Sequence, residues 1–301
     1  MTDGAATGAG STTTHSRYAA LVVAGLVFQE VGASVAVLLF PQVGALGMVF
    51  LRVLFSAVIL LPIARPSLRG VRGTSWLTVI GFGLVLALMN GLFYLSLDRI
   101  PLGAAVTIEV LGPLVLSVVA ARRAIAWLWA GLAAVGVALL GEGSFGDLDP
   151  IGVLLAAGAG AAWAGYILLS RQTGRRFAKL DGLALAMLIG AIAAAPFGIV
   201  SAGSALLRPE VLLLGAAVAL LSSTIPYGLE LLALRRLHPS AFAILLSLAP
   251  AIAALAGLAL LHQTFTWVGV IAVVLVVSAS IGAVWSARAH EPAPEAPDEM
   301  G

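Results

Sequence analysis

Thr107-Ile108-Glu109-Val110-Leu111-Gly112-Pro113 is the stretch around which the rest of the chain can be interpreted. It lies inside an apolar run over about residues 102–120, which is long enough to cross a bilayer as a helix. Pro113 has no N–H, so the carbonyl of Glu109, four residues earlier, lacks its helical partner. Glu109 also carries a carboxylate, and an ionised group in hydrocarbon is by default a functional feature. The alternative is a packing kink in which Glu109 is tied to a neighbouring polar group.

The composition is that of an integral membrane protein. Hydrophobic residues make up 61% of the chain and charged residues 10%, whereas a soluble domain carries about 25% charged residues. The net charge of +2 does not indicate nucleic-acid binding, because the arginines fall in short loops between apolar segments. We therefore expect a lipid bilayer and no nucleic acid as partners. With no cysteine, a disulfide framework and a thiolate metal site are excluded.

Ten apolar segments of the length of a spanning helix follow one another and predict an all-α fold. The predicted spans cover residues 19–39, 44–64, 76–97, 102–120, 124–141, 150–171, 181–200, 211–234, 240–261 and 266–287. The ends of the chain, residues 1–18 and 288–301, are polar or rich in Pro and acid, and we expect both to be disordered tails.

The distribution of positive charge predicts the orientation of these spans. All but three of the 16 Lys and Arg residues fall on one side of the topology. Arg99 and Arg208 fall on the other side, and Arg52 lies within a span. The positive-inside rule makes the crowded side cytoplasmic, so the span count is even and both termini are cytoplasmic.

A weak internal repeat divides the spans into two sets of five. A shift of 137 residues places Pro113 on Pro250, and the two copies would cover residues 19–141 and 150–287. Because each copy has an odd number of spans, the second is inverted, which is typical of secondary transporters. Gly112, Pro113 and Pro250 then mark paired helix breaks, which point to a central site.

Three charged residues fall at one depth in the membrane. Counted at about 1.5 Å per residue from the cytoplasmic ends, Glu30, Arg52 and Glu109 lie roughly 16–18 Å in, near the midplane. Apolar helices do not need such a cluster, whose natural use is to hold a zwitterion or to exchange protons. Arg52 either forms a structural ion pair with a carboxylate or contacts the substrate directly. In both cases we expect the three to form one network.

Aromatic and polar side chains elsewhere in the spans are further candidates for the wall of a cavity. Asn90 and Tyr94 belong to a polar and aromatic patch, and Trp163 and Tyr166 lie among glycines. The commoner use of such glycines is close helix packing. Packing and cavity lining are equally good interpretations of these four side chains.

Tyr227 and Glu230 are a candidate inner gate. They follow Pro226 in a span, and Glu230 lies only about one turn from the cytoplasmic end. The equally good alternative is that Glu230 snorkels toward the interface and pairs with Arg235.

Enzyme motifs are missing from the sequence. The four histidines lie in tails or at predicted helix ends, and neither a Gly-x-Ser-x-Gly elbow nor a Walker loop is present. We therefore expect no catalytic residue, no metal and no cofactor. The energy source is most simply an ion gradient, and a buried glutamate is a suitable proton carrier.

Four motifs carry a resemblance to a known family: residues 89–96 (Met-Asn-Gly-Leu-Phe-Tyr-Leu-Ser), 109–114 (Glu-Val-Leu-Gly-Pro-Leu), 163–168 (Trp-Ala-Gly-Tyr-Ile-Leu) and 227–231 (Tyr-Gly-Leu-Glu-Leu). In them the chain resembles the EamA-type drug/metabolite transporter superfamily, and within it the bacterial threonine/homoserine exporters. The resemblance implies a ten-helix inner-membrane carrier that exports amino acids through a central cavity in exchange for protons. It assigns to the cavity or gate Glu109, Asn90, Tyr94, Trp163, Tyr166 and Glu230.

The chain also departs from that family pattern. Relatives often carry Glu before the proline of the ninth helix and Gly-Glu at its end, where this chain has Ala249 and His262-Gln263. Glu30 stands where a neutral amide is usual. The expected function is export of threonine- or homoserine-like amino acids by alternating access. One alternative is export of hydrophobic drugs or nucleosides on the same fold, and another is a non-transporting membrane scaffold or lipid-handling enzyme.

Overall fold

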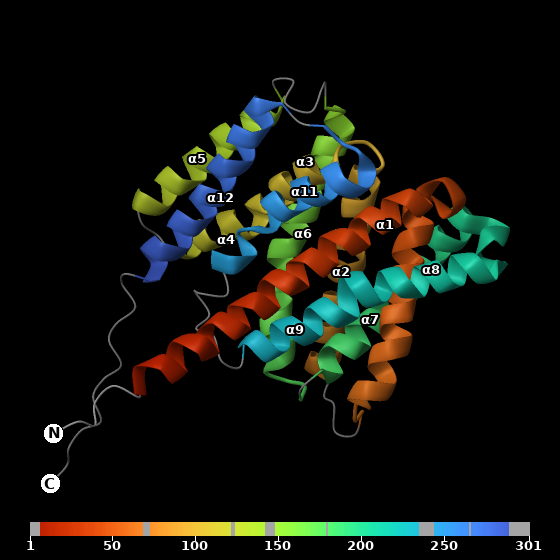
Figure 1. Ribbon diagram of the computed structural model, residues 1–301. Coiled ribbons are helices and arrows are strands. Elements are labelled where there is room, and N and C mark those ends of the chain that lie inside the picture. Colours follow the sequence, from red (N-terminus) through yellow and green to blue (C-terminus); the bar gives the residue numbers. More distant parts are fainter. Residues whose placement is uncertain are drawn as a thin grey trace, which may run out of the picture.

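The computed structural model describes residues 7–68, 73–121, 124–141, 148–178, 180–234, 244–264 and 266–288. Throughout these ranges the regular structure is helical, as predicted, and no strand occurs within them (Figure 1). Seven of the described helical segments are long and apolar enough to cross a membrane, and two shorter apolar ones accompany them. The elements are α1 (Thr7–Ala64), α2 (Gly73–Leu97), α3 (Leu102–Glu109), α4 (Leu111–Ala121), α5 (Ala124–Gly141), α6 (Pro150–Gly174), α7 (Asp181–Ala202), η1 (Gly203–Leu207), α8 (Pro209–Ala219), η2 (Leu220–Thr224), α9 (Ile225–Leu234), α11 (Ala249–Leu261) and α12 (Trp267–Arg288).

Helix α1 contains two of the predicted spans. Its backbone bends at Gly44, whose φ of 69° and ψ of 165° are not helical. Glycine is suited to this position because a side chain disfavours positive φ. The chain reverses direction there, so that α1 runs diagonally across the bundle and then turns back (Figure 1). The two parts correspond to the predicted spans at residues 19–39 and 44–64.

The apolar run around Glu109 forms two consecutive helices with only Val110 between them, and Val110 keeps helical backbone angles (φ −63°, ψ −16°). Helix α3 ends at Glu109, and α4 begins at Leu111. The Val110 N–H still bonds the Val106 carbonyl at 3.0 Å, and the Leu114 N–H bonds the Val110 carbonyl at 3.2 Å. The ladder therefore continues on both sides of the carbonyl that Pro113 is unable to bond.

A second break lies before α11. Residues 244–246 are helical, Ser247 and Leu248 form a turn, and α11 begins at Ala249 with Pro250 in its first turn. Proline fits a first helical turn because the N–H it lacks would have no partner there. Under the 137-residue shift, Ser247 corresponds to Val110.

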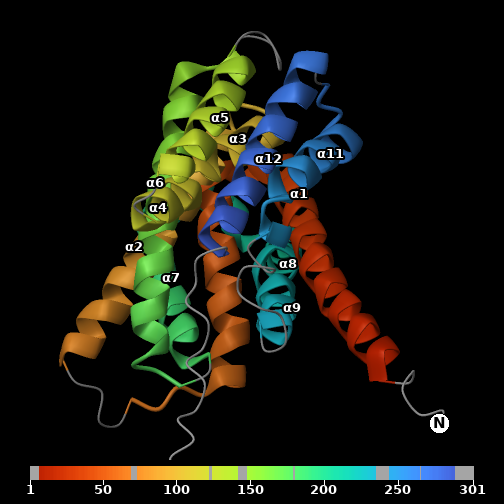
Figure 2. The same cartoon turned by 90° about the vertical axis from the view of Figure 1, so that its left-hand side faces the viewer.

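The helices pack in a pattern that places α1, α2 and α3 in the middle of the bundle. Helix α5 lies along α12, α3 along α11, α2 along α6, and the second part of α1 along α7 (Figures 1 and 2). Helix α1 also packs against α8, η2 and α9. The largest apolar cluster joins α1, α2, α3 and α7 through fully buried side chains such as Met48, Leu86, Leu102 and Met187.

Large apolar side chains also cover the outside of the bundle. Val200 is 86% exposed and Trp267 83% exposed, and leucines and valines on most helices are likewise uncovered. A soluble monomer rarely exposes continuous apolar surface of this kind. The outer surface is therefore suited to contact with lipid.

Candidate functional site

Arg52 is the centre of a buried polar cluster in the middle of the bundle. Its Nε donates to Ser223 Oγ at 3.2 Å, Nη1 donates to the Tyr94 hydroxyl at 3.1 Å, and Nη2 donates to the Ser222 carbonyl at 3.0 Å. Its Cζ also lies 5.4 Å from the centroid of the Tyr94 ring, within range of a cation–π interaction. Arg52 therefore connects the second part of α1 with α2 and with η2.

The Ser222 carbonyl is available to Arg52 because of an irregular stretch of helix. Residues Leu220–Thr224 form a π-helix, and the Ile225 N–H bonds the Leu220 carbonyl five residues earlier. The residue four positions after Ser222 is Pro226, which has no N–H to offer that carbonyl. Ser222 and Ser223 were not among the predicted site residues. A proline has no N–H for the carbonyl four residues earlier. This reasoning drew attention to Glu109 through Pro113, and it would draw attention to Ser222 through Pro226.

Glu30 and Glu109 lie close to Arg52 without touching it. Glu30 is 2% exposed, Arg52 8% and Glu109 9%. The three side chains are within Coulombic range of one another. Among the described residues, no carboxylate oxygen comes within 4.0 Å of an Arg52 nitrogen. The guanidinium is instead held by neutral acceptors, so neither carboxylate has Arg52 as a contact partner.

Helix α6 fixes the position of the Glu109 backbone. A Cβ placed on Gly160 would lie 2.5 Å from the Glu109 carbonyl oxygen, and one placed on Gly112 would collide with the Gly160 backbone. The break between α3 and α4 therefore sits directly against α6, in a contact that admits only glycine. Trp163, three residues after Gly160, is half-buried on the same helix.

The remaining predicted residues of α2 differ in their surroundings. Tyr94 is fully buried, and its ring packs against Phe40 and Phe93 at centroid distances of 5.8 and 6.0 Å. Asn90 is buried but donates through Nδ2 to the Leu86 carbonyl of its own helix at 2.8 Å. Tyr94 thus belongs to the Arg52 cluster, whereas the recorded hydrogen bond of Asn90 is local.

The predicted gate and cavity residues lie in two different places. Tyr227 on α9 is half-buried and within Coulombic range of Arg52. Tyr166 on α6 packs against Phe82, with ring centroids 5.1 Å apart. The side chains of Glu230 and of Arg235 lie outside the described residues.

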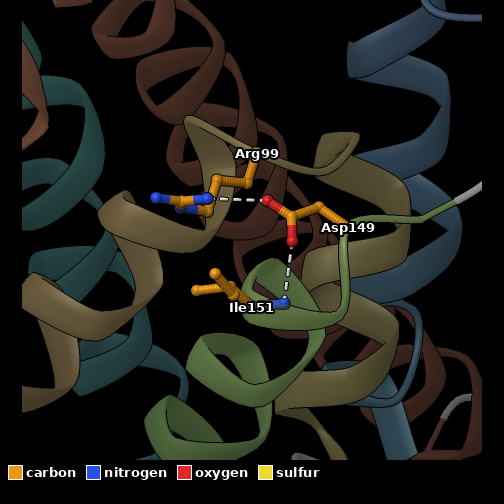
Figure 3. Close-up of polar contacts among 3 residues, drawn as sticks. All are labelled: Arg99, Asp149 and Ile151. Atoms are coloured by element: carbon orange, nitrogen blue, oxygen red, sulfur yellow. Dashed lines mark hydrogen bonds and ion pairs between the residues drawn. The ribbon is translucent and has the colours of Figure 1, made fainter.

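Hydrogen bonds connect α2 and α6 near both ends of the pair. At one end Arg99 Nη1 lies 2.7 Å from Asp149 Oδ2, and the other Asp149 oxygen accepts the Ile151 N–H at 2.8 Å as the cap of α6 (Figure 3). The hydrogen bond from Arg99, followed by that from the Ile151 N–H, lowers the pKa of Asp149 below its usual value. At the other end Arg176 Nη1 donates to the Thr74 carbonyl and to Thr78 Oγ1, both at 2.5 Å.

Metal chemistry has no visible support in the described part of the chain. Within those ranges, no group of three or more His, Asp or Glu side chains is placed to hold a metal ion. The polar groups that converge in the bundle are a guanidinium, two carboxylates and neutral hydroxyl and carbonyl acceptors.

A bundle of apolar helices with a lipid-facing surface and a buried charged cluster is the architecture of a multi-pass membrane transporter. Residues 150–285 match the EamA-like transporter family. The threonine/homoserine exporter RhtA of Salmonella typhimurium (strain LT2) is 40% identical over 260 residues, which is 85% of this chain and 88% of that protein. The exporter of the same name from Escherichia coli (strain K12) is 38% identical with the same coverage. The chain belongs to the EamA-like transporter family and is a transporter, not an enzyme.

The fold is also similar to that of a solved structure. One crystal structure matches 91% of this chain and 99% of its own chain, with a TM-score of 0.54 and 21% sequence identity. This similarity supports the arrangement of the helices and says nothing about what is transported.

Proposed function

We propose that this protein exports small amino acids, such as threonine and homoserine, from the cytoplasm in exchange for protons. The observation that carries the proposal is the buried cluster of Glu30, Arg52 and Glu109, whose opposite charges suit a zwitterion. The relatives that are 38–40% identical over most of the chain are threonine/homoserine exporters, which supports the same cargo. In this proposal the protein lies in the bacterial inner membrane with both termini in the cytoplasm, as the positive-inside rule predicts.

The proposed transporter is built from two inverted repeats of five spans, residues 19–141 and 150–287. The bounds of the helices support this division, because the 137-residue shift carries α2 (Gly73–Leu97) onto the stretch from α8 to α9 (Pro209–Leu234). It also carries the turn at Val110 onto the turn at Ser247–Leu248.

The packing of the helices supports the same symmetry. Exchanging the repeats converts the contact of α2 with α6 into the contact of η2 and α9 with the first part of α1, which occurs where Gly32 meets Ser222 and Gly25 meets Pro226. The pair of α5 with α12 and the pair of α7 with the second part of α1 are each converted into themselves. This is the expected pattern for a two-fold axis in the membrane plane, around which alternating access takes place.

The two carboxylates give the cluster a means of exchange. Glu30 and Glu109 have no contact from Arg52, so an ionised carboxylate is open to the ammonium of a substrate or to a proton. Protonation neutralises the carboxylate and removes its attraction for the ammonium, which makes proton and substrate competitors for one site. This competition couples the outward movement of an amino acid to the inward movement of protons.

Arg52 is suited to the carboxylate end of the substrate. A guanidinium has five N–H donors, and the recorded hydrogen bonds of Arg52 go to three acceptors. The remaining N–H groups can donate hydrogen bonds to the carboxylate of a substrate. The positive charge of Arg52 also offsets the negative charge of the two glutamates. Tyr94 positions the guanidinium, and Trp163, Tyr166 and Asn90 stay candidates for the wall, as Tyr227 and Glu230 do for the inner gate.

The proposal is tested by efflux of labelled threonine, homoserine and a panel of other amino acids from loaded cells. The unmodified protein should release a small set of amino acids selectively, and Glu109→Gln should abolish that release while insertion into the membrane is unchanged. Near-normal transport by Glu109→Gln would refute the role of Glu109. Absence of amino-acid efflux from inserted, unmodified protein would refute the amino-acid cargo and redirect the search to hydrophobic drugs and nucleosides.

A further inference from the structure

The charged side chains that are buried in the described part of the chain form a single cluster with unequal charges. They are Glu30, Arg52 and Glu109, and each lies within Coulombic range of the other two. Two carboxylates accompany one guanidinium, so the cluster has an excess of one negative charge when all three groups are ionised. An uncompensated charge inside a protein is costly, and within a membrane there is little water to offset it.

The described neighbours of the cluster do not supply the missing positive charge. The recorded hydrogen bonds of Arg52 go to hydroxyl and carbonyl oxygens. Glu30 has a side-chain hydrogen bond with the amide of Gln29, which is neutral. The surroundings recorded for the Glu109 carboxylate are burial and the charges of Glu30 and Arg52. The charge that balances the cluster therefore arrives with a ligand or as a proton.

Glu30 lies on a different side of α1 from the side that packs on η2 and α9. Gly25 and Gly32 are about two turns apart, and Cβ atoms on them would meet Pro226 and Ser222. Glu30 comes five residues after Gly25, so it lies about 140° around the helix from that contact. Among the described residues, no carboxylate oxygen comes within 4.0 Å of the guanidinium that η2 holds. The opposite charges are thus near each other without touching, as a ligand that contacts both of them requires.

A diamino acid has the charges that complement this cluster. Ornithine and lysine carry an α-carboxylate, an α-ammonium and a side-chain ammonium at neutral pH, because the pKa of the side-chain amine is about 10.4. The α-carboxylate can pair with Arg52, the α-ammonium with Glu109 and the side-chain ammonium with Glu30. Threonine has no second ammonium, so it leaves the Glu30 carboxylate without a counter-charge unless that carboxylate holds a proton.

We propose that the cluster of Glu30, Arg52 and Glu109 also transports amino acids with a cationic side chain, and that Glu30 determines this specificity. The inference rests on the proposed function and orientation, in which Arg52 and Glu109 hold the carboxylate and the ammonium of the substrate. It goes beyond them by naming a second class of substrate. A zwitterionic amino acid is carried with a proton on Glu30, whereas a cationic amino acid replaces that proton with its own ammonium.

Competition between two isosteric amino acids tests the proposal in the unmodified protein. The side chains of ornithine and norleucine have the same length, and the terminal ammonium of ornithine is a methyl group in norleucine. Everted membrane vesicles with an acidic interior and a membrane potential clamped at zero present either compound to the cytoplasmic face together with labelled threonine. Ornithine should inhibit threonine uptake at about a tenth of the norleucine concentration or less, as expected for one additional buried charge pair. Labelled ornithine should itself accumulate in the vesicles.

Substitution of Glu30 tests which residue recognises the side-chain ammonium. Glu30→Gln removes the charge and keeps the size, so the ratio of kcat/KM for ornithine to that for norleucine should fall about tenfold or more. Glu30→Asp keeps the charge and should retain part of this preference. Because the ratio compares two substrates in one protein, a general loss of activity does not change it. Glu210→Gln, the same exchange at an exposed residue of α8, controls for surface charge and should leave the ratio unchanged.

The outcomes separate this inference from the proposed function. Equal inhibition by ornithine and norleucine would overturn the second substrate class and leave threonine export standing. A ratio that is unchanged in Glu30→Gln, or that falls equally in Glu210→Gln, would overturn the role of Glu30. The competition experiment needs no variant, so it decides even where Glu30→Gln does not fold. Absence of threonine uptake by the inserted, unmodified protein would overturn the proposed function as well.

Discussion

The guanidinium of Arg52 donates a hydrogen bond to the Ser222 carbonyl at 3.0 Å, beside the point where Pro226 offers no N–H to the preceding turn of helix. A proline on one span thus lies beside the acceptor for a buried cation on another. The π-helix η2, which contains Ser222, keeps the acceptor on the side of α1. The arrangement holds the charge of Arg52 without an ion pair, so neither nearby carboxylate is bonded by the guanidinium.

Arg52→Lys tests whether this set of hydrogen bonds determines the stability of the buried cluster. An ammonium is a point charge on a flexible stem and does not reproduce the fork of a guanidinium. A buried acceptor that is left unpaired costs about 1–3 kcal/mol. We expect a lower melting temperature in detergent and a large loss of efflux. Tyr94→Phe is the milder comparison, because it removes one acceptor and keeps the ring beside the guanidinium; equal effects of the two variants would contradict this account.

Local features of the backbone, such as prolines and glycines within the spans, can be predicted from the sequence. The contacts between side chains of distant spans are harder to predict. Pro113 lies four residues after Glu109, where α3 ends and α4 follows from Leu111, and the missing N–H of a proline is a local property. The bend at Gly44 likewise falls at the first residue of the second predicted apolar segment. Such features depend on a few consecutive residues, and a hydropathy profile with its prolines and glycines contains them.

The contacts of Arg52 depend instead on how distant helices are rotated. Counting residues from the membrane surface placed Glu30, Arg52 and Glu109 at one depth, but depth does not determine which faces of the helices turn toward one another. The π-helix at Ser222 rotates the following residues relative to a regular α-helix, and the apolar periodicity does not reveal it. Tyr166 was grouped with Trp163 by sequence proximity, whereas three residues along a helix bring it to the ring of Phe82.

His262→Gly should stabilise the protein. His262 ends α11 with a φ of 54° and a ψ of 28°, in the left-handed region that favours glycine. A non-glycine residue in that region costs about 1–2 kcal/mol, and the side chain of His262 is exposed. We expect a higher melting temperature in detergent and unchanged efflux. His262→Ala keeps the Cβ and should not raise the melting temperature. An equal increase in both variants would mean that removal of the imidazole, and not relief of the backbone, stabilises the protein.

Asp149→Asn should destabilise the protein in a way that depends on pH. The hydrogen bond from Arg99 keeps the pKa of Asp149 below its usual value, so the stabilisation is present above the unfolded pKa, about 3.9, and is lost as the pH falls through the folded pKa. The melting-temperature difference between the two proteins should be small, as for exposed ion pairs, constant from about pH 7 to 5, and smaller below about pH 4. In an Arg99→Gln background most of this melting-temperature difference should vanish. A difference that persists unchanged at low pH would mean that charge plays no part.

Gly32→Ala should disturb the centre of the protein through the contact between α1 and η2. A Cβ on Gly32 would lie 2.9 Å from the Ser222 nitrogen and 3.0 Å from Leu221 Cβ, and it would collide with Ser222 Oγ. Because the Ser222 backbone is unable to yield like a flexible side chain, the added methyl group should push η2 away from α1, at a cost of about 1–3 kcal/mol. That displacement lengthens the hydrogen bond from Arg52 to the Ser222 carbonyl, so both the melting temperature and the efflux rate should fall.

Gly25→Ala is the matched control on the same helix. A Cβ there would meet the Cα of Pro226 at 3.7 Å, an ordinary van der Waals contact with α9, the helix that follows η2 directly. The change should therefore be neutral or slightly stabilising, since alanine is favoured over glycine within a helix by about 1 kcal/mol. A large loss of efflux with Gly32→Ala and little change with Gly25→Ala would tie transport to the distance between α1 and η2. Equal effects, in either direction, would show that this distance does not control the Arg52 cluster.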